Sequence, residues 1–185
     1  YRLVVDPPEI DERSADHLLD HLGPGGLAME LARRKAESVA LRHPGALVLG
    51  GDQVGVVQRG PVEGQVGVRD RSLTRMLNKQ PDVSGAVEQL MALSGTTHHL
   101  HNGMYLLDVD TGESVVDVDV QQVTMRSFPR SEATAYAERF APFDTAGSYR
   151  MEDSAEMEPG AGFVVEVIGE DDSGVLGVPL PMLAR

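Results

Sequence analysis

Cysteine is absent from the 185 residues of the chain. This absence excludes disulfide bonds, thiolate metal sites and thiol catalysis, and it fits a cytoplasmic location. Long apolar runs are absent as well, because no segment approaches the roughly 20 residues that a membrane-spanning helix needs. The first residues show no basic stretch followed by an apolar one. The sequence therefore predicts neither a signal peptide nor a membrane partner.

Basic residues are scarce. The chain has 16 Lys and Arg against 29 Asp and Glu, which gives a net charge of −13. Binding to the backbone of a nucleic-acid polymer needs Lys and Arg gathered on one face, so we expect no such partner. A small polyanion stays compatible with this charge if a basic pocket or a divalent cation offsets it locally.

The residues that are present suffice for a folded core, since 41% of them are hydrophobic. The length suits one domain or two small lobes. Alternating apolar patterns predict strands at 3–5, 46–49, 53–57, 98–108, 115–125 and 162–168. Helical patterns predict helices at 26–43, from 84 to about 94, and at 131–140, with Ser84 and Ser131 as N-caps.

The connections between these elements indicate the fold class. Asp110-Thr111-Gly112 is a turn signal that predicts a hairpin between two of the strands. Residues 58–83 are rich in Gly, Pro, Arg and Asp, and predict a long loop or an insertion. Because helices and strands interleave around this hairpin, the sequence predicts an α/β fold with a mixed sheet.

Asp52 is the most informative single residue. It follows an apolar strand and the pair Gly50-Gly51, and another apolar run comes after it. Burying a lone carboxylate is costly unless it has a partner, and neighbouring glycines let a backbone or a ligand approach closely. Asp52 is thus a candidate for holding a metal or taking a proton. The alternative is an ordinary aspartate in a solvated turn.

Several short motifs then follow one another along the chain. They are Ile10-Asp11-Glu12, Leu31-Ala32-Arg33-Arg34-Lys35-Ala36, Gly51-Asp52-Gln53-Val54, Leu93-Ser94-Gly95 with His98, Asn102-Gly103, Ala146-Gly147-Ser148-Tyr149 and Gly177-Val178-Pro179-Leu180. Each is weak alone. In this order they resemble the Maf family of nucleotide pyrophosphatases, and the resemblance covers nearly the whole chain.

The resemblance implies an enzyme that hydrolyses a nucleoside triphosphate to the monophosphate and pyrophosphate with a divalent cation, Mg²⁺ or Mn²⁺. It implies a single Maf-like domain over 1–185, with a Maf/ITPase-like fold: an elongated sheet, flanking helices and two lobes around a cleft. It also implies a cytoplasmic homodimer. The family's N-terminal strand and its Ser-x-Ser-x-Arg-Arg phosphate loop have no counterpart from Tyr1 onward.

The resemblance also assigns roles to individual residues. Asp52 matches the central active-site aspartate, which holds the cation or orients the attacking water. Glu12 matches the acidic residue that shares the metal. Lys35 and Lys79 match lysines that contact the substrate phosphates, although Lys79 stands in Asn78-Lys79-Gln80-Pro81 rather than in Gly-Lys-Pro. Without the resemblance, Glu12 and Lys35 are ordinary solvent-facing residues.

Glu152 bears on the choice of base. It lies three residues after Tyr149, where family members acting on dTTP and UTP tend to carry glutamine, and in this it resembles the branch that hydrolyses 7-methyl-GTP. A carboxylate accepts both donors of the guanine edge, N1–H and the 2-amino group. We therefore expect Glu152 to bind the base of 7-methyl-GTP. The alternative is one more solvated acid in an acidic stretch.

Two other functions stay open. The first is a dTTP/UTP pyrophosphatase. The second is a nucleotide-binding or regulatory protein that kept the fold and lost turnover, which the missing phosphate loop and the insertion at 58–83 favour. The triplet His98, His99 and His101 does not predict a metal site, because His98 points to the opposite face of a strand from the other two.

Overall fold

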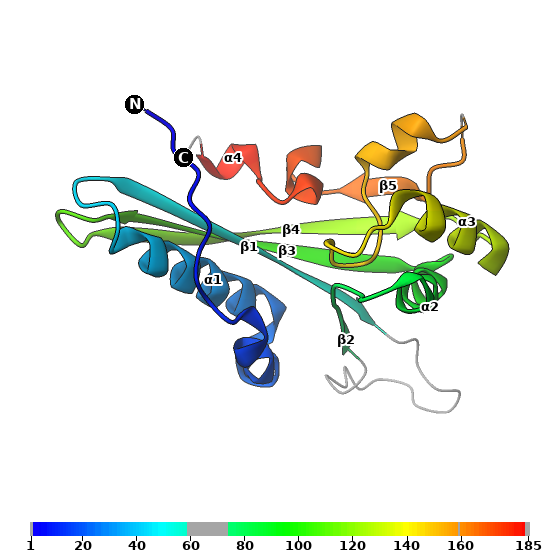
Figure 1. Cartoon of the computed structure of the whole chain (residues 1–185), viewed down its shortest axis with the longest axis horizontal. Helices are drawn as coiled ribbons and strands as arrows, with labels where there is room; N and C mark the ends of the chain where they lie inside the picture. The colour runs from blue at the N-terminus through cyan, green and yellow to red at the C-terminus, as the bar shows by residue number, and fades with distance from the viewer. Residues whose placement is uncertain (1, 59–73, 159, 184–185) are drawn as a thin grey trace.

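The computed structural model describes residues 2–58, 74–158 and 160–183. Five strands in this part form one long sheet with the order β2-β1-β3-β4-β5 (Figure 1). The strands are β1 (Leu47–Gln58), β2 (Thr74–Leu77), β3 (Thr97–Asp108), β4 (Ser114–Met125) and β5 (Val164–Ile168). The α-helices are α1 (Leu19–Ala40), α2 (Val83–Leu93), α3 (Arg130–Phe140) and α4 (Leu180–Leu183). The 3-10 helices are η1 (Glu12–Leu18), η3 (Glu152–Glu156) and η4 (Asp172–Leu176).

The α/β prediction is confirmed, but the expected mixed sheet is wrong. Each pair of neighbouring strands in the described part is antiparallel. The helix α2 does connect two strands that run in the same direction, β2 and β3. These two strands are not neighbours, because β1 lies between them and pairs antiparallel with both. The predicted hairpin at Asp110-Thr111-Gly112 joins β3 to β4 and is confirmed.

The sequence predicted separate strands on either side of the pair Gly50-Gly51. This is wrong, because β1 continues through the pair to Gln58. The helix α1 packs directly on the backbone of the strands here. A Cβ atom placed on Gly50 would lie 2.3 Å from the carbonyl oxygen of Ala32, and one on Gly103 would lie 2.3 Å from the carbonyl carbon of Ala28. Glycine is needed at both positions because the helix leaves no room for a side chain.

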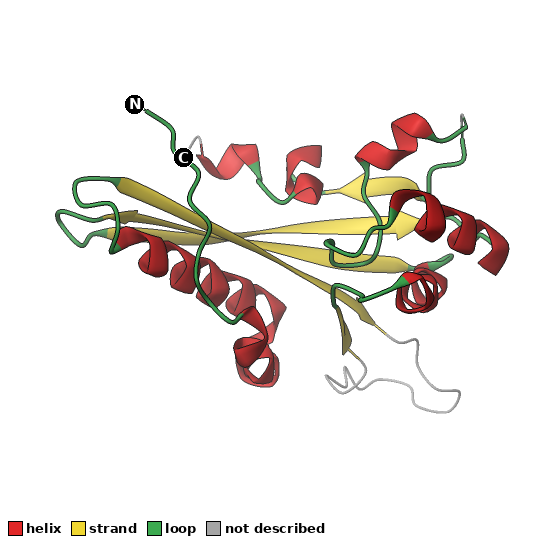
Figure 2. Cartoon of the chain, in the orientation of Figure 1, coloured by secondary structure: helices red, strands yellow, loops and turns green. Residues whose placement is uncertain are grey.

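The helices cover opposite faces of the sheet. Val54 and Val56 of β1 pack against α1, whereas Val57 points the other way and joins a core cluster built with α2 and α3. Figure 2 shows α1 along one half of the sheet and α2 and α3 at the other end. This alternation, the period of two of an extended chain, lets β1 carry side chains on both sides of the sheet.

Several predicted element ends are wrong. The expected strand at 3–5 is not formed, and Leu3 and Val5 are 91% and 89% exposed. The predicted helix at 26–43 begins earlier and ends at Ala40, and Gly23 (φ 70°, ψ 173°) is the one residue of α1 with a non-helical conformation. Glycine adopts a positive φ without strain, so the chain bends there and the helix resumes at Pro24.

Both predicted N-caps are also wrong. In α2 the cap is Asp82, whose Oδ1 accepts from the backbone N–H of Gly85 at 2.8 Å, and not Ser84. The helix α3 begins at Arg130 after Pro129 and has no side-chain cap. Of the predicted loop at 58–83, residues 59–73 lie outside the described part, and 74–77 form β2 rather than a loop. No described helix is both long and apolar enough to cross a membrane.

Candidate active site

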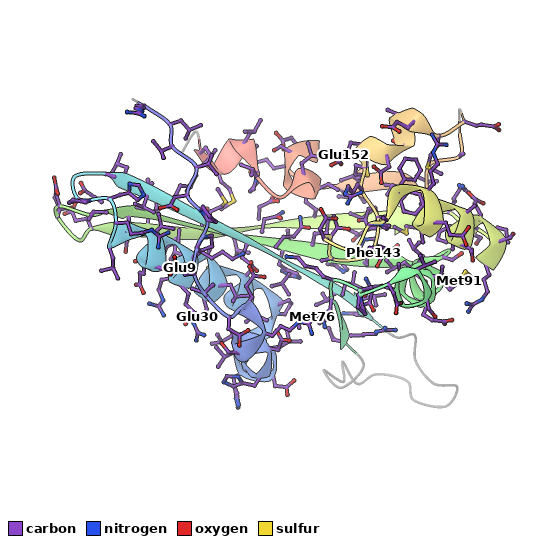
Figure 3. All side chains as sticks on the ribbon, viewed as in Figure 1. Glu9, Glu30, Met76, Met91, Phe143 and Glu152 are labelled. Atoms are coloured by element: carbon purple, nitrogen blue, oxygen red, sulfur yellow. The ribbon has the colours of Figure 1, made fainter. Side chains whose placement is uncertain are left out.

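A cavity of about 600 Å³ opens between η1, α1, β1, the connection before α2 and the segments near 144–152 and 175–178. All five residues that the sequence singled out line it: Glu12, Lys35, Asp52, Lys79 and Glu152. Glu152 of η3 and Met76 of β2, both labelled in Figure 3, come from different walls of this cavity. The structure therefore brings together residues that are up to 140 positions apart, as Glu12 and Glu152 are.

Asp52 lies in the middle of β1, opposite Gly103 of β3, on the face that α1 covers. Its side chain is only 9% exposed, which rules out a solvated turn. The ammonium Nζ of Lys35 lies 2.6 Å from Asp52 Oδ1 and 2.8 Å from Glu12 Oε1. We call Glu12, Lys35 and Asp52 the ionic triad. In it one lysine joins two carboxylates that are 40 residues apart in the sequence.

The triad changes the proton affinity of its members. Burial raises the pKa of Asp52 above its ordinary value, and the hydrogen bond from Lys35 offsets only part of this effect. Burial alone would raise the pKa of Glu12 as well, but the hydrogen bond and the charge of Lys35 outweigh it and hold this pKa below the ordinary value. For Lys35, burial is outweighed by the two carboxylates, so its pKa is raised and the amine stays charged. Asp52 is thus the member best suited to accept a proton.

Further cations line the cavity. Lys79 Nζ lies 3.9 Å from Glu12 Oε2, and its side chain is 57% exposed. Arg13 and Arg150 also line the cavity, and neither was singled out from the sequence. Arg13 is exposed and makes no ion pair with a described residue, whereas Arg150 pairs with Asp144. Together they supply the local positive charge that an acidic protein needs to bind a polyanion.

A family model described as Maf-like protein matches residues 1–185. The chain belongs to the Maf family. The resemblance deduced from the ordered motifs is thereby confirmed.

Curated relatives extend this result. A protein of Alcanivorax borkumensis named 7-methyl-GTP pyrophosphatase is 32% identical over 185 residues, covering 98% of this chain and 80% of its own. One of Syntrophotalea carbinolica with the same name is 30% identical over 159 residues, covering 86% of this chain and 71% of its own. A dTTP/UTP pyrophosphatase of Desulforamulus reducens is 28% identical over 180 residues, covering 97% and 81%.

A divalent metal is what the Maf family implies, and the ionic triad offers a test of whether it fits. Glu12 and Asp52 lie close enough to share one ammonium, so they are close enough to share one small cation. The described residues contain no group of three or more His, Cys, Asp or Glu that could hold a metal. Two carboxylates still fit Mg²⁺, which often takes one or two of them and completes its shell with water and substrate phosphates.

Glu152 and its neighbour Asp153 lie in different surroundings, although both begin η3. Glu152 is exposed, lines the cavity and makes no hydrogen bond or ion pair with any described residue. Asp153 is buried and accepts a hydrogen bond from the hydroxyl of Tyr136. The acidic stretch is therefore not uniformly solvated, and Glu152, the residue that the family position indicates, is the acid of this stretch that lines the cavity.

The predicted orientation of the histidines is consistent with the structure. His98 is fully buried, and its Nε2 lies 2.8 Å from the hydroxyl of Tyr149, a residue that lines the cavity. Burial lowers the pKa of His98 to about 4, so the ring is neutral at neutral pH. His101 lies on the other face, beside Gly25 of α1. Sequence motifs identified both His98 and Tyr149, but not the contact between them.

Proposed function

We propose that this nucleotide pyrophosphatase of the Maf family hydrolyses 7-methyl-GTP to 7-methyl-GMP and pyrophosphate. The observation that carries the proposal is the free carboxylate of Glu152 in the same cavity as the ionic triad. Relatives named 7-methyl-GTP pyrophosphatase support the same choice.

The hydrogen-bonding groups on the edge of the base explain why 7-methyl-GTP would be preferred over UTP. Guanine presents two adjacent donors, and a carboxylate can accept both of them. The 7-methyl group leaves the ring cationic, which a carboxylate also favours. Uracil presents one donor between two carbonyl oxygens, so Glu152 would be left poorly paired against it at a cost of roughly 1–3 kcal/mol. This corresponds to about a tenfold to a hundredfold preference.

The triad would act on the anhydride between the α- and β-phosphates. Water adds to phosphorus, the anhydride bond breaks, and the released proton must be accepted. Asp52 is the proposed acceptor, because it lines the cavity and its Oδ2 makes no hydrogen bond to a described residue. Lys35 and Lys79 would bind phosphate oxygens, which carry most of the charge in such a reaction.

A divalent cation, Mg²⁺ or Mn²⁺, would be held by Glu12 and Asp52 and would neutralise charge on the phosphate oxygens.

A second candidate function is hydrolysis of dTTP or UTP, which the relative from Desulforamulus reducens favours. A cytoplasmic homodimer is part of the proposal too, and light scattering after size-exclusion chromatography tests the dimer.

The experiment is a nucleotide panel with Mg²⁺ or Mn²⁺, assayed for pyrophosphate release. We expect kcat/KM for 7-methyl-GTP to exceed that for UTP and dTTP, and Glu152→Gln to shift the ratio toward the pyrimidines. Glu158→Gln is the matched control, because Glu158 is exposed in the same acidic stretch but does not line the cavity. A wild-type protein that prefers dTTP or UTP would refute the choice of base. Absence of any turnover would favour the binding-protein alternative.

A further inference from the structure

Several hydrogen bonds tie the segment that carries Glu152 to α3. Arg150 Nη1 donates to the carbonyl oxygen of Phe140 and Arg139 Nη2 to that of Glu156, and the hydroxyl group of Tyr136 makes the contacts on both sides of Glu152. Tyr136 of α3 is buried, and its hydroxyl donates to Oδ2 of Asp153. The hydroxyl oxygen of Tyr136 also accepts a hydrogen bond from the backbone N–H of Arg150 at 3.0 Å. Burial, and then the hydrogen bond to Asp153, raise the pKa of Tyr136 above its ordinary value, so the phenol keeps the proton that it donates. A single side chain thus holds the residues on both sides of the pair Met151-Glu152.

The anchor determines which way Glu152 can point. Successive side chains in a 3-10 helix lie about 120° apart around the axis. Asp153 points inward to Tyr136, so Glu152, one residue earlier, is directed away from that contact. Glu152 lines the cavity, whereas Tyr136 does not. Any influence of Tyr136 on a nucleotide must therefore pass through the segment 150–153.

We propose that Tyr136 is a positioning residue for base selection, because its hydroxyl holds Asp153 and the backbone of Arg150 and so fixes the direction from which Glu152 enters the cavity. This inference rests on the proposed function in one respect, namely that Glu152 contacts the base.

The hydroxyl can be removed without losing the packing of the ring. Tyr136 stacks near Phe140 and Phe163, with ring centroids 5.0 Å and 4.9 Å apart. Tyr136→Phe keeps these contacts and leaves the buried carboxylate of Asp153 without its donor. The nearest cation that remains is Nη1 of Arg150, 3.7 Å from Oδ2. A buried acceptor without a partner is costly, so we expect Asp153 to turn toward water and the segment 150–153 to loosen.

The test is a double-mutant cycle with Tyr136→Phe and Glu152→Gln. We expect Tyr136→Phe alone to lower the 7-methyl-GTP/UTP ratio of kcat/KM about tenfold. The change should lie in KM for 7-methyl-GTP, with kcat nearly constant because the ionic triad is untouched. In the Glu152→Gln background the same substitution should leave the ratio unchanged. Tyr105→Phe is the control, since it removes a hydroxyl from a half-buried tyrosine of β3 that does not line the cavity.

A second measurement does not depend on turnover. Amide hydrogen exchange of the nucleotide-free protein should speed up across 150–156 in Tyr136→Phe and stay unchanged in Tyr105→Phe. Unchanged exchange in Tyr136→Phe, or equal effects on the ratio in both backgrounds of the cycle, would overturn the positioning role. A wild-type protein that shows no preference for 7-methyl-GTP would instead refute the proposed function. The exchange experiment would still decide whether Tyr136 holds the segment 150–153.

Discussion

Replacing Lys35 by methionine is the most direct test of the ionic triad. The substitution keeps an unbranched side chain that is one atom shorter, and it removes the charge. Asp52, 9% exposed, then loses its cationic partner at 2.6 Å, and Glu12, 40% exposed, loses the one at 2.8 Å. Water can solvate Glu12 but reaches Asp52 poorly. We therefore expect the cost to come mainly from Asp52.

The magnitude follows from the burial. Removing one partner of a fully buried ion pair costs about 3–5 kcal/mol. Because the triad is only partly buried and Asp52 can take up a proton, we expect Lys35→Met to lower the free energy of unfolding by about 2–4 kcal/mol at pH 7. For a chain of this size, this loss corresponds to a fall in Tm of roughly 4–16 °C.

Asp52→Asn should have the opposite effect on stability. Burial holds the pKa of Asp52 above its ordinary value even beside Lys35, so ionised Asp52 destabilises the fold at neutral pH. The asparagine variant should keep or raise the Tm, and in the Lys35→Met background it should restore most of the loss. Activity of Asp52→Asn should nevertheless fall by orders of magnitude, because the proposed proton acceptor is gone.

Thermal unfolding of the two single variants and the double variant at pH 7 and pH 5 checks these values. A raised pKa means that the destabilisation by Asp52 is relieved as the pH falls, so the Tm gap of Lys35→Met should narrow at pH 5. Lys79→Met is the control, since Lys79 is more exposed and 3.9 Å from its nearest partner, Glu12. A Lys35→Met protein as stable as wild type, or near-normal turnover of Asp52→Asn, would contradict the assignment.

Three further predictions concern the cation, the helix contact and pH. Chelation should abolish hydrolysis, and Glu12→Gln should raise the Mg²⁺ concentration for half-maximal rate; unchanged dependence would remove Glu12 from the site. Gly103→Ala should destabilise the protein by about 3 kcal/mol in chemical unfolding, because the new Cβ would lie 2.3 Å from the backbone of Ala28. The pKa of His98 is about 4 in the folded chain, below its ordinary 6.5, so stability present above pH 6.5 should fall by up to about 3 kcal/mol between pH 6.5 and 4. Tm measured across this range should fall less steeply for His98→Gln than for wild type.

Local sequence was sufficient where the deciding interactions are local. The turn signal at Asp110-Thr111-Gly112 predicted the hairpin because a tight turn depends on its own residues. Local sequence did not predict that β1 continues through Gly50-Gly51. Glycine is needed there for the close approach of the distant helix α1 and not for a turn. Local sequence also failed at Ser84, because Asp82 was equally able to cap α2 and lies at the residue before the helix.

The candidate site shows a similar division. Ordered motifs predicted its members, and the structure places all five around one cavity. The pairing of Lys35 with Asp52 could not be predicted, because it depends on how α1 crosses β1. The same holds for Asp153, which looks like any other acid in its stretch until α3 places Tyr136 against it.

The glycines beneath α1 have a mechanical consequence. With no side chains between the helix and the sheet at Gly50 and Gly103, there is no compressible layer in which α1 could slide. Lys35 and Asp52 therefore belong to one rigid body, and their separation should hardly vary as the molecule fluctuates. We expect any opening or closing around a nucleotide to come from the other wall, where η3 is attached to α3 mainly by side-chain hydrogen bonds, among them those of Tyr136 and Arg139.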